Sequence, residues 1–247
     1  IITKAVCTGL VSLVAILGNI LVISAVFHVK RMRTVTNYLI VNLAVAELLY
    51  ILVAMPPFFV EIFSLYNWCM STYTRGVYFC KIVNFGQYLL VPVSVLTLAC
   101  IAADRFFAIV VPLKRVLTKR VFYWLVPGIW VVSAGLAAPV LYAYRVVEWG
   151  GHLMCSEEWG EGGIAQHASR IYTSMLFVVA YCVPFAVMAT MYTVICRKLW
   201  LRKVPGSQSA KKSSKAVESR KKVVKMLITV FVVFVACWLP VQVLALM

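Results

Sequence analysis

The feature that most constrains this sequence is a set of six long apolar stretches. Each is long enough to cross a hydrocarbon core about 30 Å thick as a helix. They cover residues 5–27, 38–60, 82–111, 122–144, 171–195 and 223–247. Backbone inside lipid must satisfy its own hydrogen bonds, and none of the six stretches shows the strict alternation of a barrel strand. The sequence therefore predicts an all-α fold, a polytopic bundle of transmembrane helices, with residues 1–247 forming a single domain.

Composition excludes a soluble fold. Hydrophobic residues make up 63% of the chain and charged residues 13%, whereas soluble proteins carry about 25% charged residues. The net charge is +16, from 24 Lys and Arg against 8 Asp and Glu. In a soluble protein this excess would indicate nucleic-acid binding, but in a membrane protein it is typical of cytoplasmic loops. We therefore expect a lipid bilayer as a partner and no nucleic acid.

The loops between the stretches differ in charge. Basic residues follow the first and third stretches and fill the loop at about 197–222, which we expect to be flexible and cytoplasmic. The loop between the fourth and fifth stretches holds half of the acidic residues of the chain, namely Glu148, Glu157, Glu158 and Glu161. The positive-inside rule then places the N-terminal end of the chain outside the cell.

Cysteines divide by side of the membrane. Cys80 opens the third stretch and Cys155 lies in the acidic loop, so both would face an oxidising compartment. We predict a disulfide between them, which would hold the acidic loop over the mouth of the bundle. Cys69 also lies on this side and would be left unpaired.

Ionisable residues at membrane depth are candidate functional sites. Glu47 lies in the second stretch, and Asn19 and Ser94 are expected at a similar depth in the first and third. This group would either bind a small cation, with sodium as the candidate, or form a hydrogen-bonded structural knot between helices. The three histidines lie at span ends or in loops. The sequence therefore offers no catalytic base within the membrane, and we expect no enzymatic activity, no cofactor and no other metal.

Several landmarks follow one another in a specific order along nearly the whole chain. The list is Gly18-Asn19, Leu43 to Glu47, Cys80, Asp104-Arg105-Phe106, Trp130, Cys155, Pro184, Tyr192, Phe234 and Cys237-Trp238-Leu239-Pro240. In this order and spacing the sequence resembles the rhodopsin-like (class A) G-protein-coupled receptors. That family has a seventh helix, so the resemblance implies that six of its seven helices are present here, in a multi-pass protein of the plasma membrane.

The resemblance also implies a mechanism and roles for individual residues. An extracellular ligand would favour one of two packings of the bundle, and the sixth helix would swing outward about Pro240 to admit a heterotrimeric G protein. Arg105 would exchange Asp104 for Tyr192 and the G protein. The residues that match the family's connecting cluster are Pro184, Val95 and Phe234. Glu47 stands where the family usually has Asp, which weakens the expectation of a sodium ion.

The ligand class follows from the residues around the bundle mouth. Gln87 takes the place where amine receptors carry Asp, which argues against a monoamine. The mouth as a whole resembles neuropeptide receptors of the neuropeptide FF, orexin and neuropeptide Y group. We expect a basic, C-terminally amidated peptide, with ligand-binding residues Gln87, Trp238, Gln242, Glu157, Glu158 and Glu61. An alternative interpretation, in which these acidic residues form a solvated loop without a role in ligand binding, stays open.

Three other classes of membrane protein are alternatives to a peptide receptor. A voltage-gated channel needs a basic residue at every third position of one helix, and no stretch has this pattern. A secondary transporter would show paired halves with broken helices, and the sequence shows no such symmetry. A class A receptor for a non-peptide ligand is the remaining alternative.

Overall fold

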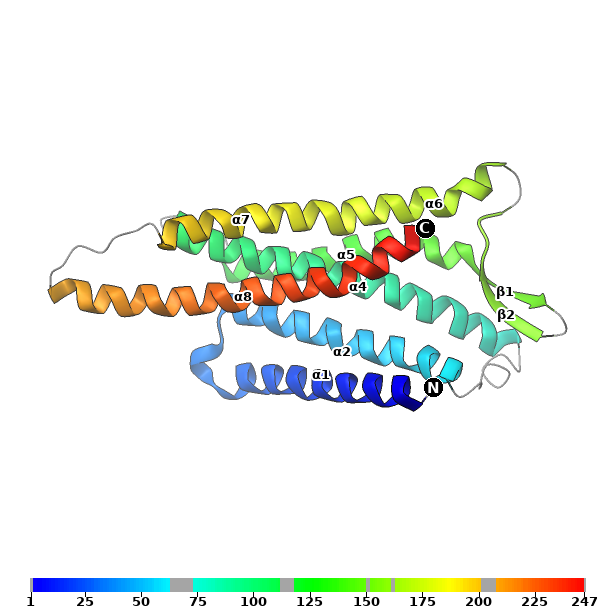
Figure 1. Cartoon of the computed structure of the whole chain (residues 1–247), viewed down its shortest axis with the longest axis horizontal. Coiled ribbons are helices and arrows are strands. Elements are labelled where there is room, and N and C mark those ends of the chain that lie inside the picture. Colours follow the sequence, from blue (N-terminus) through cyan, green and yellow to red (C-terminus); the bar gives the residue numbers. More distant parts are fainter. Residues whose placement is uncertain are drawn as a thin grey trace.

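Long helices dominate the computed structural model, which describes residues 2–62, 73–111, 118–149, 152–160, 163–200 and 208–246. In chain order the elements are α1 (Ile2–His28), η1 (Lys30–Met32), α2 (Val35–Ile62), α4 (Tyr73–Val110), α5 (Lys119–Ala143), β1 (Tyr144–Trp149), β2 (His152–Glu157), α6 (Gly163–Leu176), η2 (Phe177–Cys182), α7 (Val183–Trp200) and α8 (Gln208–Leu246). The long helices run side by side, with α1 beginning and α8 ending toward the end that carries β1 and β2 (Figure 1). We call this the hairpin end of the bundle.

Five segments of the described chain are long and apolar enough to cross a membrane. They are Ala5–His28, Val35–Phe58, Gly76–Val110, Arg120–Ala143 and His167–Trp200. Residues 223–246 of the sixth stretch lie in α8, which ends at Leu246. The predicted helical bundle is therefore confirmed.

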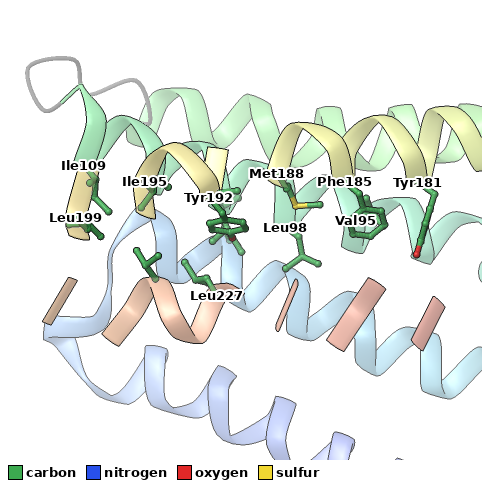
Figure 2. Close-up of a cluster of buried hydrophobic side chains, with 14 residues drawn as sticks. Val95, Leu98, Ile109, Tyr181, Phe185, Met188, Tyr192, Ile195, Leu199 and Leu227 are labelled. Atoms are coloured by element: carbon green, nitrogen blue, oxygen red, sulfur yellow. The ribbon is translucent and has the colours of Figure 1, made fainter. Parts of the chain in front are cut away.

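The core of the bundle lies around α4, which packs against α2, α5, α7 and α8. Its main cluster brings together Val95 and Leu98 of α4, Phe185 and Met188 of α7, and Leu227 of α8 (Figure 2). Lipid acyl chains are as apolar as leucine side chains. Such a cluster therefore holds helices together by close packing and not by the exclusion of water.

One close approach depends on a glycine. At Gly86 of α4 an added Cβ would lie 2.9 Å from a γ-methyl of Val53 on α2. Small residues at helix interfaces let backbones come near each other, so Gly86 sets the spacing of these two helices near the hairpin end.

A β-hairpin in the acidic loop was not predicted from the sequence. Strands β1 and β2 pair antiparallel, with Val146 opposite Cys155 and Trp149 opposite His152. Strand β1 is rich in Val, Tyr and Trp, which favour strands. A run of six residues is, however, a weak signal beside six long apolar stretches. The fold class is unchanged, since the hairpin is a local element of a helical bundle.

The loop predicted at 197–222 differs from the structure at both ends. Helix α7 continues to Trp200, and α8 already begins at Gln208. The basic segment before the apolar part of α8 contains Ala, Lys, Glu and Arg, which are good helix formers. Glu218 and Lys222 also form an i,i+4 ion pair at 3.1 Å, an arrangement that supports a helix.

Helix geometry changes ahead of Pro184. Between α6 and α7 the segment η2 is a π-helix, and the N–H of Val183 donates to the carbonyl of Val178, five residues earlier. Proline lacks an N–H and disturbs the regular ladder before it, and single π turns are typical of functional sites in helices. The π segment turns Tyr181 toward α8, where its hydroxyl donates to the carbonyl of Val235 at 3.1 Å.

Candidate functional site

The hairpin is fixed to the bundle at two points. The predicted disulfide is present, joining Cys155 of β2 to Cys80 near the start of α4, with their Cα atoms 5.5 Å apart. The backbone N–H of Glu158 donates to the carbonyl of Ala143 at 2.7 Å, which closes the hairpin onto the end of α5. Because both ends of the hairpin are held, the acidic residues that follow Cys155 have defined positions at this end of the bundle.

Glu157 is the centre of a polar network there. Its Oε1 accepts hydrogen bonds from Nε1 of Trp159 at 2.5 Å and from Oγ of Ser169 at 2.8 Å. The carboxylate is exposed, so it keeps acceptor capacity for a ligand. Gly160, at φ 106°, then supplies the left-handed turn that a residue with a side chain rarely adopts.

Aromatic rings line the bundle beside this carboxylate. Trp159 contacts Tyr172 of α6 with ring centroids 5.1 Å apart, and Tyr172 stacks on Tyr88 of α4 at 6.2 Å. Tyr88 in turn lies 6.4 Å from Tyr144 of β1. We call Tyr88, Tyr144, Glu157, Trp159 and Tyr172 the mouth cluster. Burial, reinforced by the neighbouring Tyr88 and Glu157, raises the pKa of Tyr144, so its phenol stays protonated and remains a hydrogen-bond donor.

Sequence reasoning identified Glu157 but missed the three tyrosines. They come from α4, β1 and α6, so their meeting depends on tertiary structure. The only signal in the sequence was the position of Tyr88 directly after Gln87, which is itself partly buried on α4. Glu158 lies apart from the mouth cluster, at a cavity between α4 and α5.

Several predicted residues fall outside what the structure describes. Their side chains, or in two cases the whole residue, are not described, and the set is Glu61, Cys69, Glu161, Trp238, Pro240 and Gln242. Their proposed roles therefore stay predictions.

The opposite end of the bundle carries the Asp104-Arg105 pair. Arg105 Nη2 lies 3.0 Å from Asp104 Oδ2. Thr36 of α2 joins this pair: its hydroxyl donates to Asp104 Oδ2 at 2.5 Å and accepts a hydrogen bond from Nη2 of Arg105. Within the described residues no hydrogen bond joins Arg105 to Tyr192. Thr36 was missed by sequence reasoning, because a single threonine at a helix end is unremarkable without its spatial neighbours.

Arg105 also faces a cavity of about 300 Å³ between α4 and α8. Arg220 and Ser219 of α8 lie on the far wall of this cavity. Glu218 of α8 pairs with Lys222 on its own helix. The cavity is therefore positively charged, with its two arginines on facing helices.

Between the two ends, the predicted connecting residues lie in or beside the main core cluster. Val95 belongs to it and Phe234 packs against it. The ring of Phe185, which follows the buried Pro184, lies 5.9 Å from that of Phe234. Nearer the Asp104 end, the rings of Tyr192 and Phe231 have their centroids 5.8 Å apart. These contacts join α4, α7 and α8 in a continuous apolar path (Figure 2).

The candidate sodium residues are only partly brought together. Asn19 Nδ2 donates to Glu47 Oε2 at 2.9 Å, which joins α1 to α2. Ser94 is buried on α4, and in the part of the chain that the structure describes no hydrogen bond joins it to Glu47. An amide N–H turned toward the carboxylate supports the hydrogen-bonded structural interpretation over a cation site, so no step below involves sodium.

A second polar knot ties three helices at mid-depth. Asn42 of α2 donates to Thr97 of α4 at 2.8 Å and accepts from Nε1 of Trp130 on α5 at 3.0 Å. The Thr97 hydroxyl donates a hydrogen bond to the carbonyl of Val93 at 2.7 Å. Every buried polar group in this knot has a partner, as a low-dielectric interior requires.

Comparison with known proteins gives a consistent family. The family model described as 7 transmembrane receptor (rhodopsin family) matches residues 18–247. Among curated relatives, the RYamide receptor of Drosophila melanogaster is 32% identical over 240 residues, which cover 94% of this chain and 50% of the relative.

Two further relatives have a sequence identity to this chain similar to that of the RYamide receptor. The neuromedin-K receptor of Rattus norvegicus is 34% identical over 232 residues, covering 94% of this chain and 49% of its own. The QRFP-like peptide receptor of Branchiostoma floridae is 35% identical over 239 residues, covering 94% and 60%. The chain thus spans about half the length of the first curated relatives it matches.

Proposed function

Because the chain belongs to the rhodopsin family of seven-transmembrane receptors, we propose that it is the membrane domain of a receptor for an extracellular neuropeptide, which activates a heterotrimeric G protein. The hairpin end faces outward from the plasma membrane and the Asp104 end faces the cytoplasm. This orientation is supported by the disulfide, which needs an oxidising compartment, and by the basic residues at the other end.

The observation that carries the peptide proposal is the mouth cluster. It combines a carboxylate that has open acceptor positions with four aromatic rings, each of which carries a hydroxyl or an indole N–H. A guanidinium forms charge-assisted hydrogen bonds with such a carboxylate and stacks on aromatic faces. The cluster therefore suits a peptide that presents an arginine beside an aromatic residue, and the similarity to an RYamide receptor agrees with an amidated Arg-Tyr end.

Gln87 completes this site. Its amide lies one residue before Tyr88, partly buried on α4, and an uncharged donor and acceptor at this position suits a C-terminal amide better than a carboxylate. Trp238 and Gln242 of α8 and Glu61 of α2 are proposed to contribute from the facing helices.

Transmission follows from the apolar path between the ends. A ligand shifts the bundle toward the packing that it binds more tightly. In the structure Arg105 is held by Asp104 and Thr36, and in our proposal these contacts hold the closed packing. Outward movement of α8 about Pro240 would separate Phe231 and Phe234 from α7, free Arg105 to contact Tyr192, and widen the basic cavity for a G-protein segment.

A charge-exchange experiment tests the peptide site. The probe is a synthetic peptide ending in Arg-Tyr-amide, and a second peptide carries citrulline, which keeps the shape of arginine without its charge. We expect Glu157→Gln to weaken binding of the arginine peptide about five- to tenfold, as for a partly exposed charged pair worth about 1 kcal/mol. Binding of the citrulline peptide should be little affected by the substitution.

The matched control is Glu148→Gln, which removes the same charge from an exposed position on β1. If both substitutions weaken binding equally, the acids act only as a diffuse negative rim. If Glu157→Gln weakens both peptides equally, the direct pairing of Glu157 with arginine is wrong.

A further inference from the structure

A second site lies at the hairpin end, outside the mouth cluster. A cavity of about 850 Å³ opens between α4, α5 and β1, within the size range of small-molecule sites, about 300–1,000 Å³. Its charged lining residues are Lys81, Arg145 and Glu158, and it shares no residue with the mouth cluster. The adjacent residues Glu157 and Glu158 therefore lie at two different sites, Glu157 in the mouth cluster and Glu158 at this cavity.

The depth of this cavity relative to a membrane follows from the candidate spans. Val77 and Lys81 lie at the beginning of the span Gly76–Val110, while Leu141 and Tyr142 lie at the end of the span Arg120–Ala143. The cavity is therefore at the boundary between hydrocarbon and water, where lipid headgroups lie. Tyrosine is typical of this depth because its ring is apolar and its hydroxyl polar.

The protein uses only some of the hydrogen-bond donors of Lys81 and Arg145. Lys81 Nζ donates to the carbonyl of Leu141 at 2.8 Å, and Arg145 Nε donates to the carbonyl of Tyr142 at 3.5 Å. These bonds satisfy carbonyls in the last turn of α5, which lack partners within their own helix. An ammonium has three donors and a guanidinium five, so most of their donors are left over.

No carboxylate of the described chain neutralises them. Neither Lys81 nor Arg145 is in a salt bridge among the described residues, and Glu158 is likewise not in one. Arg145 instead lies over the ring of Tyr142, 5.0 Å from its centroid. The cavity thus presents two cations and one separate anion to whatever enters it.

We propose that this cavity binds the headgroup of a zwitterionic phospholipid from the outer leaflet, a phosphocholine lipid. The phosphate lies between Lys81 and Arg145, where a guanidinium offers paired donors to its oxygens. The quaternary ammonium lies toward Glu158. The acyl chains run along the exposed apolar surface just below, where Ile82, Leu141 and Tyr142 are 56%, 40% and 57% exposed.

Charge complementarity selects this occupant over an anionic lipid or a free phosphate. A purely anionic headgroup would satisfy the two cations but leave Glu158 beside a negative group. Free phosphate would leave the apolar wall of the cavity uncovered. Because β1 forms part of the wall, a bound lipid would also hold the hairpin against α4 and α5.

The test uses the complete receptor in maltoside detergent, with lipid binding followed by native mass spectrometry. The probes are dioleoylphosphatidylcholine, dioleoylphosphatidylglycerol and inorganic phosphate. We expect one phosphatidylcholine to bind in preference to phosphatidylglycerol. Arg145→Ala and Lys81→Ala should each weaken it about five- to tenfold, and Arg145→Lys should recover part of the loss.

Glu158→Gln is the decisive variant, since it should reverse the preference toward phosphatidylglycerol while the cations stay in place. Arg170→Ala, which removes an exposed charge of α6 at the same end of the bundle, is the matched control and should bind like the unsubstituted receptor. Should Lys81→Ala fail to fold because the α5 end loses its cap, the exposed Arg145 carries the test.

Three outcomes overturn the proposal. Equal binding of the two lipids to the unsubstituted receptor would remove the role of Glu158. Unchanged binding in Arg145→Ala would place the lipid elsewhere. Displacement of the lipid by millimolar inorganic phosphate would show a soluble-anion site. None of these results bears on the peptide proposal, which rests on the mouth cluster.

Discussion

Thr36 offers the sharpest test of how the closed arrangement is held. Its hydroxyl is the only group of α2 that the structure shows bonded to both Asp104 and Arg105 among the described residues. Thr36→Ala removes both hydrogen bonds while leaving the Asp104–Arg105 ion pair in place. We expect the substitution to raise ligand-independent G-protein activation.

The magnitude follows from the exposure of the partners. Hydrogen bonds to charged groups contribute about 1.5–3 kcal/mol each, but the side chains of Arg105 and Asp104 are 27% and 17% exposed, so water replaces part of the loss. We therefore expect the substitution to destabilise the closed packing relative to the open one by about 1.4 kcal/mol. That changes the equilibrium between closed and open packings about tenfold.

The assay is nucleotide exchange on a purified G protein by the complete receptor, without ligand, at matched receptor density. Thr36→Ser keeps the hydroxyl and should behave like the unsubstituted receptor. Thr193→Ala is the matched control, because its hydroxyl donates only to the carbonyl of Ala189 on its own helix. Unchanged basal exchange in Thr36→Ala, or an equal rise in Thr193→Ala, would refute the reasoning.

Three further predictions concern the frame of the bundle. Gly86→Ala places a methyl group 2.9 Å from a valine side chain and should lower the melting temperature, whereas Gly128→Ala, with nothing within 4 Å, should leave it unchanged or raise it; equal shifts would contradict the close approach. Cys155→Ser removes a disulfide between residues 75 apart in the sequence and should lower the free energy of unfolding by about 2–5 kcal/mol. It should also lower peptide affinity. Full peptide binding by this variant would show that the hairpin holds its place without the disulfide. Trp130→Phe leaves Asn42 without one of its partners and should lower the free energy of unfolding by about 1–3 kcal/mol, measured in detergent against Trp124→Phe, whose ring is 78% exposed.

Much of the architecture was predictable from one-dimensional patterns. Span length and hydropathy are properties of consecutive residues, so a bundle of long apolar helices could be predicted from them. The Cys80–Cys155 bond was also predicted, because both cysteines fall on the side of the bundle that was expected to face an oxidising compartment. The order of landmarks such as Asp104-Arg105 and Pro184 then indicated the family.

The basic segment 208–222 shows where such patterns fail. Polar composition indicated a flexible loop, but Lys, Arg, Glu and Ala favour helix as strongly as they favour solvent. The choice between the two depends on continuity with the apolar helix that follows. Local composition alone does not contain that information.

For the functional site the division has a physical cause. The sequence by itself determined which residues cross the membrane, which end is basic and which cysteines can bond, because solvation and charge act on each segment separately. Only the tertiary structure decided that Tyr88, Tyr144 and Tyr172 meet around Glu157, and that Thr36 joins Asp104 to Arg105. It also separated Glu158 from the mouth cluster and placed it at the same cavity as Lys81 and Arg145. Such groupings depend on how helices from distant parts of the chain pack, and packing is decided by side-chain shapes on several elements at once.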